Sequence, residues 1–172
     1  MTFIILLKSL PEVIAAREKF TACHEREKNV GASAFDLSWL EQVETSREDG
    51  LFVMSGGVLF YFEEEKVKSL FAALAQKFPA GGICFDAVNK KGLEKSNKVV
   101  EKSGNKGAKI VFSLDDAEKE LSAWSPAFKK VSVCRRLAPE IKKAKSIPFG
   151  TRFAVNMGLR LGFMQFVEIR FR

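Results

Sequence analysis

The stretch that most constrains the fold is Leu51–Phe62, LFVMSGGVLFYF. It is typical of a short apolar strand, Leu51–Met54, followed by the small residues Ser55–Gly57 and an amphipathic turn that carries Tyr61. Open α/β sheets build ligand sites from such units, because ligands bind where strands end and small residues let them approach the backbone. A plain strand–turn–helix corner with glycines for close packing is the alternative, since a Gly-Gly pair alone is a weak motif.

Length and composition favour one soluble globular domain over residues 1–172, with enough chain to bury a core. Hydrophobic residues make up 47% and charged residues 28%, which excludes a disordered chain. No apolar run approaches the ~20 residues of a membrane span, and TFIILL lacks the flanks of a signal peptide. The cysteines, Cys23, Cys84 and Cys134, suit neither a zinc site nor a CxxC pair, so we expect no metal and a reducing cytoplasm.

The net charge of +7 is concentrated in the second half of the chain. Residues 86–172 hold 19 lysines and arginines against 9 acids, mostly in the clusters Lys90–Lys109 and Lys129–Lys145. Such clusters attract nucleic acid or acidic ligands, but these lack the interleaved aromatic residues of a stacking platform. We interpret them as solvated helix faces. A nucleic-acid binder remains open on charge alone, to be tested by a salt-dependent shift with DNA.

Strands and helices alternate along the chain. The expected strands are Thr2–Leu7, Val30–Phe35, Leu51–Met54, Ile83–Asp86, Val131–Arg135 and Phe163–Phe171. The expected helices begin near Pro11, Glu63, Lys90, Asp116 and Phe149. This order predicts an α/β protein with a mostly parallel sheet, helices on both of its faces, and Leu51–Met54 in the sheet interior. The alternating strand Phe163–Phe171 is expected to run antiparallel to its neighbour.

Two helices carry apolar positions that we expect to face the core. In the second helix, Glu63–Phe78, these positions recur at helical spacing: Val67, Leu70, Phe71, Leu74 and Phe78. In the first helix they are Val13, Ala16 and Phe20.

An ordered set of segments resembles the leucine carboxyl methyltransferase family, in particular its bacterial branch similar to the polyketide O-methyltransferase of tetracenomycin synthesis. The segments are SLPEVIAAREKF, GASAFDLSWLEQV, LFVMSGGVLFYFEEEKVKSLFAALAQKFPAGGICFDA, FSLDDAEKELSAW and MQFVEIRF. The resemblance implies a Rossmann-like class I fold that binds S-adenosylmethionine. It covers the family's C-terminal two-thirds. The family's first strand, glycine-rich loop and N-terminal cap have no counterpart, and no G-x-G follows any expected strand.

The resemblance also implies the cofactor-binding residues. The family's adenine segment falls on Ser33, Ala34 and Phe35, with Asp36 following. Its glutamate–glycine pair falls on Gly56 and Gly57, where Ser55 offers the only nearby side-chain oxygen. The family's aspartate near the ribose is replaced by Ser9.

Two further residues, Tyr61 and Asp86, are candidates for contact with the substrate because they lie at or near strand ends. A core-edge tyrosine and a capping acid are the alternatives. The implied function is S-adenosylmethionine-dependent O-methylation of a small polyketide-like or carboxylate acceptor. The alternative is a catalytically inactive remnant or an interaction module, which would form a homodimer or bind a complementing partner through an exposed strand edge. We expect this chain alone to bind S-adenosylmethionine weakly or not at all. Loss of a charge-assisted bond to the ribose costs about 1.5–3 kcal/mol, and the missing glycine-rich loop weakens binding further.

Overall fold

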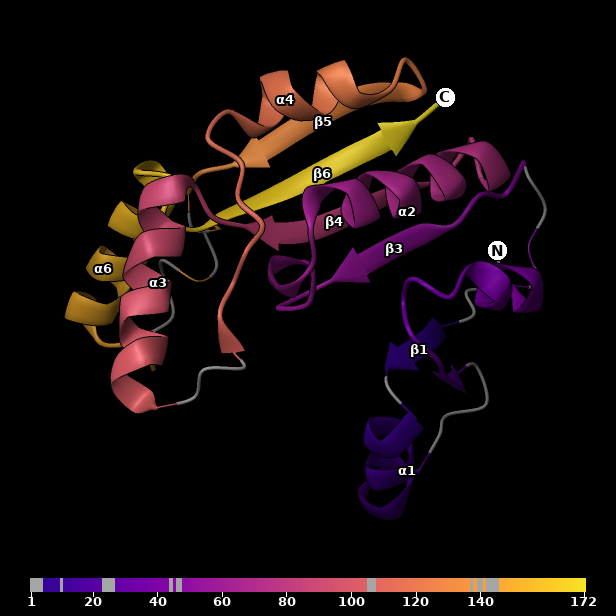
Figure 1. Ribbon diagram of the computed structural model, residues 1–172, viewed down its shortest axis with the longest axis horizontal. Coiled ribbons are helices and arrows are strands. Elements are labelled where there is room, and N and C mark those ends of the chain that lie inside the picture. Colours follow the sequence, from indigo (N-terminus) through magenta and orange to yellow (C-terminus); the bar gives the residue numbers. More distant parts are fainter. Residues whose placement is uncertain are drawn as a thin grey trace. The chain divides into compact units, whose positions relative to one another are not determined.

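The computed structural model describes residues 5–9, 11–22, 27–43, 45, 48–104, 108–136, 138, 141 and 146–172. The chain forms two compact units, Met1–Thr45 and Ser46–Arg172. Figure 1 labels helices and strands of both units. A single domain over 1–172 stays a prediction.

The first unit is a two-stranded parallel sheet with one helix. β1 (Ile5–Ser9) pairs with β2 (Glu27–Gly31), α1 (Pro11–Phe20) connects them, and the short 3₁₀ helix η1 (Leu37–Gln42) follows. Residues 2–4 of the first expected strand lie outside the described residues.

The predicted core face of α1 is wrong. Ile14 is the buried residue of this helix, whereas Val13 and Ala16 are exposed and Phe20 is 87% exposed. A Cβ on Gly31 would lie only 3.1 Å from the Pro11 Cα, so the start of α1 approaches β2 closely. Because Ile14 is three residues after Pro11, it shares that face of the helix. The contact between Pro11 and Gly31 therefore sets the rotation of α1.

The second unit contains a four-stranded mixed sheet. Its order is β3 (Phe52–Ser55), β4 (Gly82–Ala87), β6 (Gln165–Phe171) and β5 (Phe128–Cys134). β3 and β4 are parallel, and β6 runs antiparallel to both β4 and β5. Three strands thus share one direction and β6 opposes them, as the arrows in Figure 1 show. The antiparallel C-terminal strand is confirmed.

Helices α2 (Glu64–Lys77) and α4 (Ala117–Trp124) cover one face of this sheet. All five positions expected to face the core from α2 are buried. The Phe71 ring lies 5.1 Å from that of Phe85 on β4 and 6.0 Å from that of Trp124 on α4, measured between ring centroids. Figure 1 shows α2 lying along β3 and β4. This aromatic cluster fixes the sheet beneath the helices.

The interior position predicted for Leu51–Met54 is wrong for the described sheet, because β3 pairs with β4 alone and forms an edge. An apolar run is typical of a strand that is buried on both faces. In β3, however, only Val53 and Ser55 lie on the face that α2 and α4 cover. Met54 is 81% exposed, and Phe52 and Phe166 are also exposed on the other face. Helices on both faces are therefore not found among the described residues of this unit.

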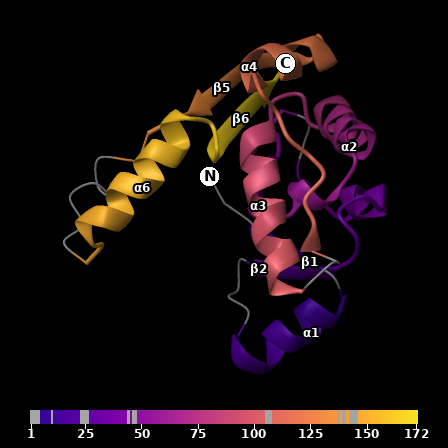
Figure 2. The same cartoon turned by 60° about the vertical axis from the view of Figure 1, so that its left-hand side comes forward.

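Two more helices begin or end near the carboxyl end of β4. α3 (Lys90–Ser103) carries the first basic cluster on an exposed helical surface. α6 (Phe149–Arg160) extends away from α3 and the sheet, as Figure 2 shows, and buries only Leu159. The second basic cluster is not a helix face at its start, because Lys129 and Lys130 belong to β5. None of the described helices has the length and apolar character needed to cross a membrane.

Candidate functional site

The carboxyl ends of β3 and β4 are joined by one hydrogen-bonded pair. The Gly57 amide donates to both carboxylate oxygens of Asp86, at 2.8 Å to Oδ1 and 3.0 Å to Oδ2. The parallel register sets this contact, since Ser55 is the partner of Phe85 in the ladder. The structure thus brings together two of the predicted site residues that stand 29 positions apart.

Close packing does not explain the two glycines. A Cβ built on Gly56 or on Gly57 would meet nothing within 4 Å. Gly57 adopts a φ of +69°, which disfavours any side chain, so its backbone conformation requires glycine. Gly56 has no such conformation, and open space lies beside its backbone. That space leaves room for a ligand to approach the chain.

Cys84 precedes this site on β4 and is half-buried. Burial raises the pKa of its thiol, and the negative charges of Glu168 and Asp86 raise it further. A thiol with a raised pKa stays protonated at neutral pH and is a poor nucleophile. The chemistry available at these strand ends is therefore that of a carboxylate and backbone amides, with no thiolate.

Asn89 organises the turn that follows β4. Its Oδ1 accepts a hydrogen bond from the Gly92 amide at 2.8 Å and caps α3, and its Nδ2 donates to the Leu161 carbonyl at 2.9 Å. The Asn89 amide also donates to the Gly162 carbonyl. One side chain thus ties the start of α3 to the turn before β6. Sequence reasoning missed Asn89, although asparagine directly before a helix is a frequent cap.

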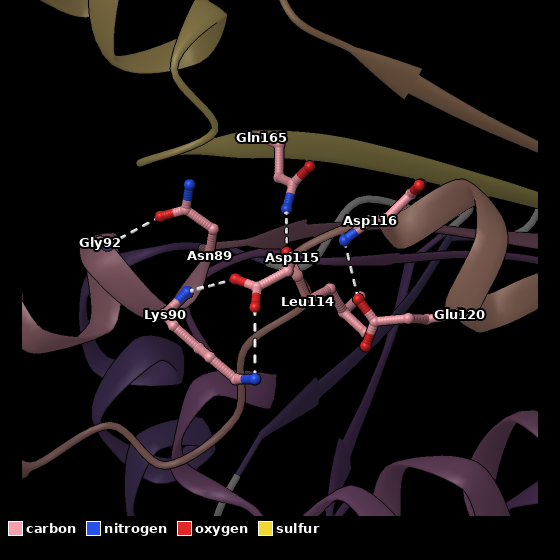
Figure 3. A network of polar contacts seen from close by, with 8 residues as sticks. All are labelled: Asn89, Lys90, Gly92, Leu114, Asp115, Asp116, Glu120 and Gln165. Carbon is pink, nitrogen blue, oxygen red and sulfur yellow. Dashed lines mark hydrogen bonds and ion pairs between the residues drawn. The ribbon is translucent and has the colours of Figure 1, made fainter.

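A polar network continues from this turn to the connection before α4, as Figure 3 shows. The Lys90 amide donates to Asp115 Oδ1 at 2.9 Å, and the Lys90 ammonium lies 3.3 Å from Oδ2. The amide and ammonium of Lys90 lower the pKa of Asp115. The buried Gln165 side chain donates to the Leu114 carbonyl at 2.8 Å. These bonds hold the connection against the carboxyl end of β4.

Tyr61 lies on the 3₁₀ helix η2 (Leu59–Tyr61), between β3 and α2. The Phe60 carbonyl accepts hydrogen bonds from the amides of Val111 and Phe112, at 2.7 and 3.1 Å. These bonds fix η2 to the connection before α4. Tyr61 itself is 48% exposed, so it is accessible to a ligand.

The remaining predicted residues lie in the first unit. Ser9 ends β1 and pairs with Gly31 at the end of β2, so both strands finish at the same edge. Ser33–Asp36 form the turn after β2, closed by a bond from the Asp36 amide to the Ser33 carbonyl. Asp36 caps η1 by accepting from the Ser38 amide, and the Trp39 indole donates to the Ala34 carbonyl. The structure gathers these residues at one sheet edge.

The described residues contain no group of three or more histidine, cysteine or acidic side chains that could hold a metal ion.

The structure is similar to solved methyltransferases. A candidate methyltransferase from Thermobifida fusca aligns over 98% of this chain with a TM-score of 0.63 and 12% identity. A SAM-dependent methyltransferase from Anabaena variabilis aligns over 98% with a TM-score of 0.57 and 12% identity. Human N-acetylserotonin methyltransferase, solved in complex with SAM, aligns over 97% with a TM-score of 0.53 and 12% identity. The fold is the Rossmann-like class I fold of SAM-dependent methyltransferases, as the family resemblance implies.

The chain spans only part of these proteins. It covers 63% of the Thermobifida fusca protein, 68% of the Anabaena variabilis protein and 40% of the human enzyme. No family model matches the sequence, and no curated protein matches it.

Proposed function

We propose that this chain works as an S-adenosylmethionine-dependent O-methyltransferase of a small molecule, in the leucine carboxyl methyltransferase family and its polyketide-modifying bacterial branch. The observation that carries the proposal is the likeness to solved methyltransferases over almost the whole of this chain. The ordered family-like segments support it independently. The described cysteines, Cys84 and Cys134, are free thiols, which suits the cytoplasm.

The cofactor-binding residues of this proposal are those that the family resemblance implies. They are Ser9, Ser33, Ala34, Phe35 and Asp36 in the first unit, and Ser55, Gly56 and Gly57 in the second unit. In the second unit, the open space beside the Gly56 backbone leaves room for part of the cofactor. In the first unit, a hydrogen bond from the Asp36 amide to the Ser33 carbonyl closes the turn after β2. S-adenosylmethionine supplies a methyl group that is already activated on a sulfonium. The protein then has to orient the acceptor oxygen and exclude water.

Asp86 and Tyr61 are the proposed acceptor-side residues. The Gly57 amide holds the Asp86 carboxylate at the end of β4, where it could accept the proton of an acceptor hydroxyl. The alternative role of Asp86 is structural, because the same bonds fix the turn at Gly57. Tyr61 would contact a polyketide-like or carboxylate acceptor through its exposed ring and hydroxyl.

Titration with S-adenosylmethionine, followed by amide chemical shifts in NMR, tests the proposal. We expect binding weaker than about 10 µM, because the ribose-side acid is replaced by Ser9. The shift changes should concentrate at Ser33–Asp36 and Ser55–Gly57. Gly56→Val should weaken binding by about tenfold or more by filling the open space. Gly150→Val, placed in equally open space on α6, is the matched control.

Two results would contradict the proposal. One is no shift change at these residues at millimolar cofactor, and the other is equal weakening by both valine variants. Binding in the low micromolar range would instead mean that another segment replaces the glycine-rich loop. Transfer of a labelled methyl group to phenolic polyketides or carboxylates then tests the acceptor class.

The second candidate function is a non-catalytic interaction module. It is favoured by β3, which forms an edge of the described sheet and exposes Met54. An unpaired apolar edge is a site for pairing with another chain. Light scattering after size exclusion tests this candidate. A dimer that dissociates in Met54→Lys supports pairing through β3, and a monomeric protein without cofactor binding removes both candidate functions for the isolated chain.

A further inference from the structure

An open pocket of about 840 Å³ lies at the end of the second unit's sheet opposite to Gly57 and Asp86. It is formed by the loop before β4, the start of β5 and the end of β6, near the label C in Figure 1. The residues that line it are Pro79, Ala80, Gly81, Lys129, Lys130, Arg170, Phe171 and Arg172. Four of these eight residues have cationic side chains, and none has an acidic side chain.

Three of the four cations have free side chains. Arg170 is engaged, since its guanidinium pairs with Glu168 and lies 4.6 Å from the Phe52 ring centroid. Lys129, Lys130 and Arg172 are exposed, and their side chains form no ion pair or hydrogen bond with the described residues. The pocket therefore gathers three cationic side chains that no described side chain neutralises.

The backbone of β5 places Lys129 and Lys130 at the pocket. The pairing of β5 with β6 shifts register between Phe128 and Lys130, so Lys129 is the extra residue of a bulge. Bulges re-aim side chains and occur next to functional sites. After the bulge Lys130 stands directly opposite Arg170 in the ladder. Because Glu168 already pairs with Arg170, Lys130 adds a second cation at this end of the sheet.

The wall of the pocket is rigid. The Phe171 amide donates to the Gly81 carbonyl at 3.0 Å, and the Arg172 amide donates to the Ala127 carbonyl at 3.0 Å. A Cβ on Gly81 would lie 2.2 Å from the Leu51 carbonyl oxygen, so the loop before β4 packs directly on the backbone. The backbone that carries the cationic side chains is thus held in place before a ligand binds, which lowers the entropy lost on binding.

We propose that this pocket binds the phosphate groups of a small phosphorylated ligand. The side chains of Lys129, Lys130 and Arg172, which have no acidic partner among the described residues, suit a multiply charged phosphate, with which they form strong charge-assisted hydrogen bonds. The volume falls within the range of small-molecule sites. Pro79 and Phe171 offer an apolar wall to the organic part of such a ligand. The site is separate from the proposed methyl-transfer site and does not rest on it.

Calorimetric titration of the whole chain with inorganic pyrophosphate tests the proposal. The double variant Lys130→Gln/Arg172→Gln should bind pyrophosphate at least about tenfold more weakly, because each substitution removes a charged hydrogen-bond donor. The control Lys66→Gln/Lys119→Gln removes the same charge from exposed lysines of α2 and α4 and should change binding less than about twofold. Unfolding curves of both variants show whether the fold is kept.

A nucleoside diphosphate distinguishes the source of the phosphate. Tighter binding than pyrophosphate indicates an organic phosphate whose remaining part uses the apolar wall, and equal binding indicates a free inorganic phosphate. The proposal is overturned if pyrophosphate does not bind at low salt, or if both double variants lose binding equally. A single-stranded oligonucleotide that binds tightly to the wild type and to the pocket variant alike would also overturn it.

Discussion

Gly57→Ala should destabilise the protein, whereas Gly56→Ala should not. Both glycines border open space, so a methyl group clashes at neither position. They differ in backbone conformation, since only Gly57 has a φ in the left-handed region, at +69°. A side chain in that region costs about 1–2 kcal/mol. Gly56→Ala is a surface change that should alter the free energy of unfolding by less than about 0.5 kcal/mol.

Urea unfolding followed by tryptophan fluorescence measures the difference. With an m-value of about 2 kcal/mol/M, the loss in Gly57→Ala corresponds to a midpoint lower by about 0.5–1 M. The m-values of both variants should equal that of the wild type. Equal losses in the two variants would refute the reasoning, because the conformation of Gly57 would then not be the source of the effect.

A double variant tests whether the hydrogen bond from the Gly57 amide to Asp86 holds the conformation of Gly57. Asp86→Ala removes the acceptor of the Gly57 amide, which holds the turn in place. We expect the double variant Gly57→Ala/Asp86→Ala to lose less stability than the sum of the single losses, with a coupling of about 0.5 kcal/mol or more. Additive losses would mean that the carboxylate does not hold the conformation of Gly57.

Other changes test the rest of the second unit. Gln165→Leu should cost about 1–3 kcal/mol in urea unfolding, because the buried Leu114 carbonyl loses its donor; an unchanged midpoint would contradict this. Leu159→Ala should cost about 2–5 kcal/mol because Leu159 is buried, whereas Phe149→Ser should cost less than about 0.5 kcal/mol because Phe149 is 76% exposed. The lowered pKa of Asp115 adds stability that is complete above its unfolded pKa, near 3.8, and is lost as the pH falls through the lower folded pKa. Acid unfolding of Asp115→Asn should therefore lack that part of the decline, and an identical acid profile would contradict the role of Lys90.

Local patterns in the sequence predicted the elements that depend on local physics. The buried face of α2 followed from its helical spacing, and the buried residues of β6 followed from its alternation. Asp36 and Asp116 cap η1 and α4 by accepting bonds from the amides of Ser38 and Lys119, the role that aspartate directly before a helix commonly has. Each of these depends on residues within one or two turns, where sequence patterns are informative.

Features that depend on distant partners could not be predicted in the same way. The edge position of β3 depends on which strands pair with it, and its apolar run cannot reveal that. The contact between Gly57 and Asp86 depends on the register of β3 against β4. Lys129 and Lys130 were interpreted as part of a helix face. That interpretation could not be made reliable from the sequence, because a run of lysines is equally compatible with a helix and with a strand. They lie in a strand because β5 pairs with β6.

The arrangement of β4 and β6 allows the two proposed sites to act independently. Gly82 begins β4 near the basic pocket, and Asp86 stands close to its other end. β6 runs the opposite way, from Gln165 beside Leu114 to Arg170 at the pocket. A strand rises about 3.3 Å per residue, so the two ends of β4 lie roughly 15 Å apart, which exceeds the Debye length of about 8 Å in physiological salt. Charge changes at Lys130 and Arg172 should therefore leave S-adenosylmethionine binding unaltered, and Gly56→Val should leave pyrophosphate binding unaltered. If a change at one end weakened the binding of both ligands, S-adenosylmethionine and pyrophosphate, the sheet would have to transmit a structural change between its ends.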